Sequence, residues 1–254
     1  GFFIIYSFFG PYMPSVIAHK GASLSKGMSH YWLSTEGVFG VALGVSTGMV
    51  FMFVLFGALL ERAGAGNYFI RVAFAMMGHF RGGPAKAAVV SSAMTGLVSG
   101  SSIANVVTTG TFTIPLMKKL GYRAQFAGAV EAAASTGGML MPPVMGAGAF
   151  VMAEITGIAY IKIVIAAMLG SILYYASLVA RVHFTAMKRD LIGVGDVRLV
   201  SYRQLVRDLY LLAPMVLLVV LLVKGYSPFL SANAAIGLTF VISFLKKETR
   251  MTPV

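Results

Sequence analysis

The most polar short stretch of this chain, LVSGSSIANVVTTG at residues 97–110, lies inside an apolar block. Its serines and glycine can form a turn, and Asn105 and Thr109 follow on the next segment. If that segment is a helix, its first amide groups point toward the turn and favour an anionic ligand. The last carbonyl groups before the turn, with the serine hydroxyls, suit a hard cation such as Na⁺. The stretch therefore indicates a site for small ions.

A second irregular stretch, ASTGGMLMPP at residues 134–143, lies near the centre of the apolar run 125–154. Its two glycines weaken a helix, and Pro142 and Pro143 remove two backbone donors and disfavour helical geometry before them. We interpret the stretch as a broken helix with free carbonyl groups near the middle of a membrane. Two interrupted elements at similar depth are typical of a transporter binding site.

The candidate ligands come from these two stretches. We assign Ser101, Ser102, Asn105 and Thr109 to the substrate, and Ser99, Gly100, Asn105, Thr136, Gly137 and Gly138 to Na⁺. The alternative for each serine or glycine is close packing between membrane helices, and the alternative for the two prolines is a simple kink.

Glu131 is a third candidate, as an intramembrane carboxyl. It lies about eight residues after Arg123, or ~12 Å along a helix. An ionisable residue at that depth is a functional candidate by default. The alternative is a carboxyl satisfied by a neighbouring helix, which the small residues of AGAVEAAAS would allow to approach closely. We find no transition-metal ligand spacing, and we expect no cofactor other than Na⁺ as the coupling ion.

Enzymatic readings fit this sequence poorly. A serine protease inside a membrane needs a His or Lys base near its serine, and none lies at the depth of the turn. The glycine-rich AGAGN at residues 63–67 lacks the lysine of a phosphate-binding loop. The chain has no Cys, which excludes thiolate chemistry. We therefore expect no enzyme, and an ion gradient as the energy source.

Composition places the chain in a lipid bilayer. Hydrophobic residues make up 58% of its 254 residues and charged residues 11%, against about 25% charged in soluble domains. The mean hydropathy is +0.84. The net charge of +12 could suggest nucleic acid, but Lys and Arg cluster at the ends of apolar spans, as the positive-inside rule requires. We expect no nucleic-acid partner.

The apolar segments predict an all-α polytopic membrane protein with six spans and one hairpin. The predicted spans are 2–17, 37–60, 125–154, 158–182, 209–223 and 229–245, with polar connections at 18–36 and 188–207. Residues 67–80 are too short to cross and carry Arg71 and His79, so an amphipathic helix at the interface is predicted there.

The hairpin is predicted from charge and length. The basic clusters at 62–86, 118–123, 188–207 and 246–250 share one side only if residues 84–117 enter and leave by the same face. One straight helix over that block would be roughly 50 Å long, against a ~30 Å hydrocarbon core. Two arms divided at Gly100 would each reach roughly 22 Å. We predict a re-entrant hairpin with its tip near SGSS; two thin full spans are the alternative.

Two segments carry a family resemblance. GHFRGGPAKAAVVSSAMTGLVSGSSIANVVTTGTFTIPLMKKLGY, followed by FAGAVEAAASTGGMLMPPVMGAGAFVMAE, resembles the large membrane subunit of tripartite ATP-independent periplasmic (TRAP) transporters. The resemblance covers roughly residues 37–190 and is closest to fused permeases that work with TAXI-type binding proteins. The hairpin motif, the GY after the basic pair and the Pro-Pro at this spacing occur together.

The resemblance implies an elevator-type secondary transporter, multi-pass in the bacterial inner membrane. Such a transporter couples Na⁺ entry to uptake of a small organic anion, usually a carboxylate, delivered by a periplasmic binding protein. Ser99–Ser102 and Asn105 would form the hairpin tip, facing an unwound helix at Thr136–Gly138 and Pro142. A small membrane subunit fused in the same chain is a further possible partner.

Only one of the two inverted repeats of such permeases is recognisable, so we expect the first repeat of a longer polypeptide that begins inside a span. The expected parts are a leading helix and connection (1–36), a scaffold helix with an interfacial arm (37–83), the transport-domain hairpin and broken helix (84–154), a membrane helix with a cytoplasmic loop (155–207) and the first helices of an incomplete second repeat (208–254). The alternatives are another Na⁺-coupled anion symporter, or a channel or scaffold subunit whose hairpin only packs helices.

Overall fold

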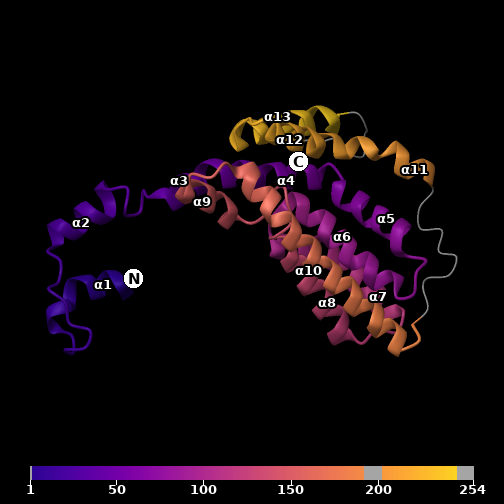
Figure 1. Ribbon diagram of the computed structural model, residues 1–254, viewed down its shortest axis with the longest axis horizontal. Helices are drawn as coiled ribbons and strands as arrows, with labels where there is room; N and C mark the ends of the chain where they lie inside the picture. Colours follow the sequence, from indigo (N-terminus) through magenta and orange to yellow (C-terminus); the bar gives the residue numbers. More distant parts are fainter. Residues whose placement is uncertain (1, 192–201, 245–254) are drawn as a thin grey trace. The chain divides into compact units, whose positions relative to one another are not determined.

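Helices form the regular structure of the computed structural model, which describes residues 2–191 and 202–244. By its internal contacts the chain divides into two units, residues 1–48 and 49–254, and each is described by itself. The basic residues 246–250 and the part of the predicted polar loop at 192–201 lie outside the described residues. Figure 1 gives the helix labels used below.

The first unit contains α1 (Phe2–Phe9), a 3-10 turn η1 (Gly10–Tyr12), α2 (Leu24–Leu33) and the start of the next helix. The leading helix is shorter than the predicted span 2–17 because Pro14 forces the preceding Met13 into extended backbone. The predicted polar connection contains α2, which begins where the Ser23 hydroxyl accepts a hydrogen bond from the Lys26 amide. Ser23 is therefore an N-cap that the sequence analysis missed.

Two helices are long and apolar enough to cross a membrane in the described part of the chain. One runs over Val41–Arg62, as α3 (Val41–Val45), a π-helical turn η2 (Ser46–Val50) and α4 (Phe51–Arg62). The other is α10 (Tyr160–Lys188). They coincide with the predicted spans 37–60 and 158–182.

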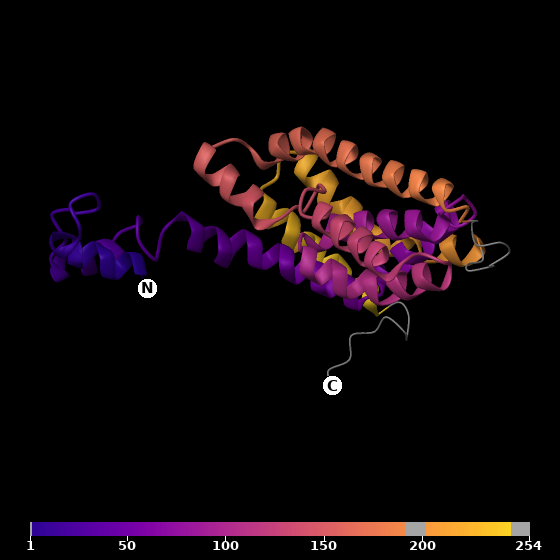
Figure 2. The same ribbon diagram turned by 90° about the horizontal axis from the view of Figure 1, so that it is seen from below.

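The remaining predicted spans are shorter apolar helices, so the count of six stays a prediction. After α11 (Tyr202–Arg207) the chain forms η3 (Leu209–Leu212) and α12 (Ala213–Val223), followed by α13 (Pro228–Ser243). Helices α12 and α13 lie side by side, and α13 also packs on α4 (Figures 1 and 2). The predicted amphipathic segment 67–80 is the helix α5 (Ala65–Met77).

Residues 83–119 form two packed helices, α6 (Gly83–Ser99) and α7 (Ser102–Lys119), at the place of the predicted hairpin, and its re-entry into the membrane stays a prediction. Their 17 and 18 residues correspond to roughly 25 and 27 Å, slightly less than a ~30 Å hydrocarbon core. Gly100 ends α6 in the left-handed region at φ 57°, and Ser101 then caps α7 by accepting from the Ala104 amide. The sequence therefore turns the chain with the residue types that such a turn requires.

The predicted broken helix is also present. Helix α8 (Ala124–Gly137) ends just after the STGG stretch begins, and α9 (Ala147–Thr156) starts beyond the two prolines. Residues 138–146 between them form turns, and Met145 adopts a positive φ of 54°. The apolar run 125–154 is thus two short helices with an irregular connection.

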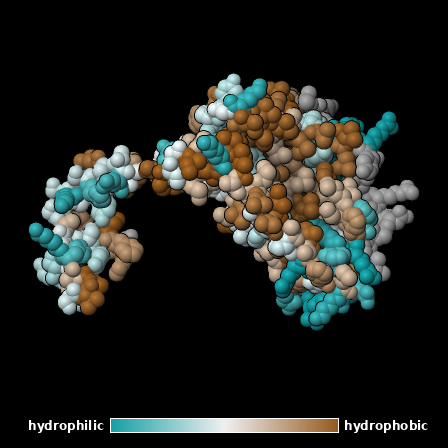
Figure 3. All heavy atoms as spheres, in the orientation of Figure 1, coloured by the Kyte–Doolittle hydropathy of each residue, from teal (hydrophilic) through white to brown (hydrophobic). Residues whose placement is uncertain are grey.

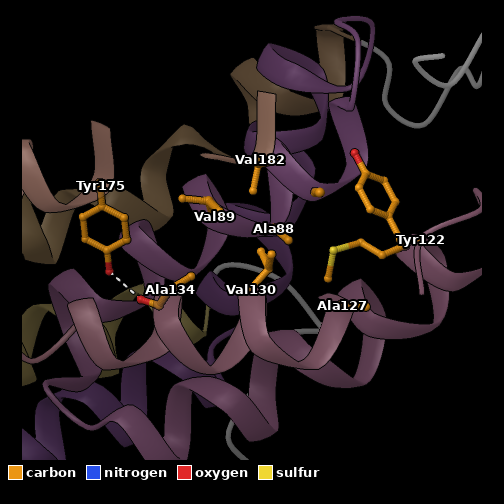
Figure 4. Packing of buried hydrophobic residues seen from close by; sticks show 10 residues of the cluster. Ala88, Val89, Tyr122, Ala127, Val130, Ala134, Tyr175 and Val182 are labelled. Atoms are coloured by element: carbon orange, nitrogen blue, oxygen red, sulfur yellow. Dashed lines mark hydrogen bonds between the residues drawn. The ribbon is translucent and has the colours of Figure 1, made fainter. Parts of the chain in front are cut away.

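Small side chains allow α6, α8 and α10 to pack closely. Figure 4 shows Ala88 and Val89 of α6 facing Ala127, Val130 and Ala134 of α8, with Val182 and Tyr175 of α10 beside them. The Tyr175 hydroxyl donates to the Ala134 carbonyl at 2.8 Å, and Tyr174 donates in the same way to Ala133. Helix α10 therefore holds α8 by its backbone as well as by apolar contact.

The outer surface of the second unit is largely apolar. In Figure 3 hydrophobic side chains cover much of this unit, while hydrophilic ones gather at the end where α7 stops and α8 starts. Along α10, Ile165, Leu169 and Leu173 are each more than 60% exposed. Contiguous exposed apolar surface of this kind suits contact with lipid or with another protein.

Candidate functional site

The turn of the hairpin lies directly against the break between α8 and α9. A Cβ atom added to Gly100 would stand 2.1 Å from the Met145 carbonyl oxygen, well inside van der Waals contact. Gly100 is therefore required both by its positive φ and by this close approach. The two interrupted elements that the sequence placed at similar depth are in contact.

A cavity of about 320 Å³ adjoins this contact. Its polar wall is the tip Ser99–Ser102, and its other lining includes Met139, Val144, Phe53 of α4 and Phe150 of α9. The volume is within the range of small-molecule sites, which are mostly apolar with a few polar groups. The cavity thus concentrates its hydroxyl and amide groups at the hairpin tip.

The tip serines are half-buried, and some of their hydroxyl groups already form hydrogen bonds within the turn. The Ser99 hydroxyl lies 3.4 Å from the Ser101 carbonyl and 3.5 Å from the Ser101 amide. The Ser101 hydroxyl caps α7. A hydroxyl that accepts one hydrogen bond keeps a donor and a further lone pair, so these groups can still contact a ligand in the cavity.

The break is held from the far side by side chains that the sequence analysis did not identify. Tyr160 donates to the carbonyl oxygens of Pro143 and Val144 at 2.7 and 2.9 Å, and Ser171 donates to that of Leu140. The Tyr160 ring also stacks on Phe150, with ring centroids 4.7 Å apart. Several of the carbonyl groups expected to be free are therefore already paired. An aromatic residue with a hydroxyl at the start of a long span was the available signal.

Other predicted ligands lie behind the tip rather than in the cavity. Asn105 and Thr109 have no exposed surface, and the Asn105 side-chain amide donates to the Ser92 carbonyl at 2.8 Å. This bond ties the two arms of the hairpin together. The assignment of Asn105 and Thr109 to substrate or Na⁺ stays a prediction, and their contacts here are with protein.

The predicted cation ligands of α8 also stand apart from the cavity lining. The Thr136 hydroxyl donates to the Ala132 carbonyl of its own helix at 2.8 Å. Gly137 lies under the rings of Tyr174 and Tyr175, and a Cβ on Gly138 would stand 2.9 Å from the Asn105 amide nitrogen. These glycines permit close helix approach here, and their role toward Na⁺ stays a prediction. Pro142 and Pro143 lie in the break, as predicted, and both are buried.

Glu131 is fully buried at the centre of a hydroxyl cluster. Ser92 of α6 and Ser135 of α8 donate to its carboxyl at 3.0 and 3.3 Å, and Thr109 and Thr113 of α7 donate as well. No Lys, Arg or His forms an ion pair with it among the residues that the structure describes. Hydrogen bonds from three helices therefore satisfy this carboxyl, as the packing alternative anticipated.

The sequence analysis did not predict which residues bind the Glu131 carboxyl, although the four-residue spacing of its partners could have indicated them. Thr109 and Thr113 are four residues apart on α7, and Glu131 and Ser135 are four apart on α8, so each pair shares a helix face. Within the described residues no group of three or more acidic or His side chains could hold a metal ion.

Comparison with known proteins gives one family. The sequence profile described as "Tripartite ATP-independent periplasmic transporter, DctM component" matches residues 3–254. A C4-dicarboxylate TRAP transporter large permease protein of Vibrio cholerae is 44% identical over 91 residues, 36% of this chain and 20% of that protein. Its counterpart from Pseudomonas aeruginosa is 29% identical over 205 residues, 79% of this chain and 47% of that protein.

A relative with a different named solute is also similar. The ectoine TRAP transporter large permease protein of Halomonas elongata is 36% identical over 95 residues, 37% of this chain and 22% of that protein. The chain thus spans less than half the length of these curated relatives.

Proposed function

The chain belongs to the DctM family of TRAP transporter large permeases, and we propose that it forms part of a Na⁺-coupled permease for a small organic anion. The family consists of transporter permeases and not of enzymes. The observation that carries the proposal is the contact between the hairpin tip Ser99–Ser102 and the α8–α9 break, both of which line a cavity of about 320 Å³.

At the tip, the C-terminal end of α6 and the N-terminal end of α7 lie close together and carry opposite partial charges. The first amide groups of α7 carry the positive end of its dipole toward the cavity, which favours a carboxylate. The last carbonyl groups of α6 and the serine hydroxyls favour Na⁺. Bound Na⁺ would make binding of the carboxylate more favourable, and the bound carboxylate would do the same for Na⁺. This mutual effect on binding is the condition for coupled transport.

The partners that we propose follow from the family and from the surface. The anion would arrive on a periplasmic binding protein of the TAXI type, and a small membrane subunit fused in the same polypeptide would complete the permease. The apolar outer face of α10 suits the bilayer or that subunit. The membrane would be the bacterial inner membrane, with the basic clusters in the cytoplasm.

The movement that we propose is an elevator. Helices α6, α7, α8 and α10 share one packed core, so they can move as one body. Helices α4 and α5 would belong to the frame, and because both pack on α6, the elevator movement would have to slide α6 along these contacts. The hydroxyl cluster around Glu131 supports rigid movement because it joins α6, α7 and α8 by hydrogen bonds.

The test is uptake by the full-length permease in proteoliposomes with its binding protein. We expect uptake to need an inward Na⁺ gradient and Ser102→Ala to lower it roughly ten-fold, because the hydroxyl is a proposed ligand. The matched control is Ser177→Ala, whose exposed hydroxyl only donates to the Tyr174 carbonyl of its own helix. Undiminished uptake without Na⁺, or equal uptake by both variants, would contradict the proposal.

A second candidate function is a channel or scaffold whose hairpin only packs helices. The observation that favours it is that Asn105 and Thr109 contact protein rather than the cavity. Cysteine labelling at Ser101 separates the two functions, and the chain has no native Cys to interfere. Labelling that changes with Na⁺ or with the anion supports the permease, and constant protection supports packing.

A further inference from the structure

A separate groove lies between the amphipathic helix α5 and the second arm of the hairpin, α7. It has a volume of about 360 Å³ and does not include the hairpin tip. Its principal lining residues are Ile70, Arg71, Phe74, Phe112, Leu116 and Lys119. The groove is therefore apolar along its length, with a cation from each wall.

The apolar wall is held in place by the hairpin beneath it. Phe74 is 7% exposed and packs with Ala87 of α6, while Ile70 and Leu116 lie partly buried against the same cluster. Phe112, by contrast, is 58% exposed. Packing against α6 thus fixes Phe74, Ile70 and Leu116 at the base of the groove, while Phe112 leaves the groove open to its surroundings.

The two cations are available to an anion. Arg71 is paired with Asp208, with 3.4 Å between Nη1 and Oδ2, and its side chain remains 43% exposed. The Arg71 Nε also donates to the Asn67 carbonyl at 3.4 Å. A guanidinium has five N–H donors, so these two contacts leave others unused. Lys119 is exposed in the last turn of α7, and no ion pair involves it within the described residues. Among the described residues that line the groove, Arg71 and Lys119 are basic and none is Asp or Glu, so the lining itself is positively charged.

We propose that this groove binds an anionic phospholipid from the leaflet on the basic side of the protein. The phosphate would contact Lys119 and the free donors of Arg71, and an acyl chain would lie along Phe74, Phe112 and Leu116. Charge complementarity selects an anion, and the apolar length selects an amphiphile over free phosphate. Basic pockets between helices on the cytoplasmic side favour such head groups.

The position of the groove gives the lipid a structural role. One wall belongs to α5 and the other to α7, so a bound lipid would join the interfacial arm to the hairpin. This proposal needs only a membrane location and stands apart from the coupling ion and the substrate. Loss of lipid binding and loss of Na⁺ coupling are therefore separate outcomes.

The experiment is native mass spectrometry of the purified full-length permease after incubation with phosphatidylglycerol or phosphatidylcholine. We expect the wild type to retain phosphatidylglycerol preferentially and Lys119→Gln to retain roughly five-fold less of it. The matched control is Lys118→Gln, which removes an adjacent exposed charge that does not line the groove. Leu116→Trp, which fills the apolar wall, should lower retention of both lipids.

Three results would overturn the proposal. One is equal retention of phosphatidylglycerol by the wild type and Lys119→Gln. Another is equal retention of the two lipids by the wild type, which would remove the role of charge. The third is a groove covered by protein, detected when a photocrosslinker at Phe112 joins another segment of the permease instead of lipid. Since Lys119 is exposed, its replacement leaves the packed core unchanged.

Discussion

A carboxyl group with no exposed surface, such as that of Glu131, must find its hydrogen-bond partners within the protein. Its four hydroxyl partners come from three helices that the chain brings together around the hairpin. Removal of the carboxyl would take away the acceptor that these hydroxyl groups share and would leave a cavity beside them. Thr109 and Thr113 would keep backbone carbonyl acceptors in α7, while Ser135 would lose its acceptor. The residue is therefore expected to matter for stability whatever its role in transport.

We predict that Glu131→Ala lowers the free energy of unfolding by roughly 2–4 kcal/mol. Glu131→Gln keeps the side-chain volume and one acceptor, so its effect should be smaller. Chemical or thermal unfolding of the permease in detergent measures both. Glu154→Ala is the control, because Glu154 is an exposed carboxyl on α9 and its loss should change stability by less than about 0.5 kcal/mol. Equal effects at the two positions would contradict the packing role.

At the scale of elements, the hairpin and the break support each other through backbone contact. Gly100 has a left-handed φ and lies against the Met145 carbonyl, while Tyr160 holds the carbonyl groups of Pro143 and Val144 from the other side. The break is therefore fixed between α6 and α10. Its geometry depends on a few named atoms rather than on the flexibility of glycine.

We predict that Gly100→Ala displaces the tip and lowers transport at least ten-fold, because its Cβ would stand 2.1 Å from the Met145 oxygen. Gly170→Ala is the matched control, since nothing lies within 4 Å of a Cβ at that helical position. Alanine also has the higher helix propensity, so the control should be neutral or slightly stabilising. Uptake assays of both variants at equal expression give the comparison, and normal uptake by Gly100→Ala would exclude the close contact.

Tyr160→Phe should loosen the break without removing its aromatic packing. The change deletes the hydroxyl that donates to two carbonyl groups, which costs about 1–2 kcal/mol. We expect a cysteine introduced at Met145 to react several-fold faster with a thiol reagent in this background. Tyr12→Phe, at an 85% exposed position, should leave the rate unchanged. Identical rates in all three proteins would show that Tyr160 does not hold the break.

The sequence predicted these elements better than it predicted their contacts. Glycine, serine and proline act through the local backbone, so the turn at Gly100 and the break before Ala147 could be located from the residue types alone. The direction of a side chain depends on helix packing, which local patterns do not contain. For that reason the sequence did not predict that the Asn105 amide donates to the Ser92 carbonyl or that Tyr160 holds the break, and the assignment of Asn105 to a ligand stays a prediction.

At the scale of the whole molecule, charge and apolar length gave the order of the helices. The basic residues at the ends of α7 and α10 predict one side of the membrane, and the uncharged turn after α9 predicts the other. Apolar length failed at the leading helix, where a proline ends the helix before the apolar residues stop. A proline can therefore end a helix inside an apolar segment, so apolar length alone does not give the number of membrane spans. That number needs a direct experimental test.

The sharpest whole-molecule prediction concerns the crossings between Lys118 and Lys188. If α8 and α9 together cross the membrane once and α10 returns, single cysteines at Lys118 and Lys188 should react with an impermeant thiol reagent from one side. A cysteine at Thr156 should react only from the other. All three positions are exposed, and the 254 residues contain no native Cys. Reaction of the Thr156 variant from the same side as Lys118 would make the α8–α9 pair a second re-entrant element and would move α10 out of the role of a full span.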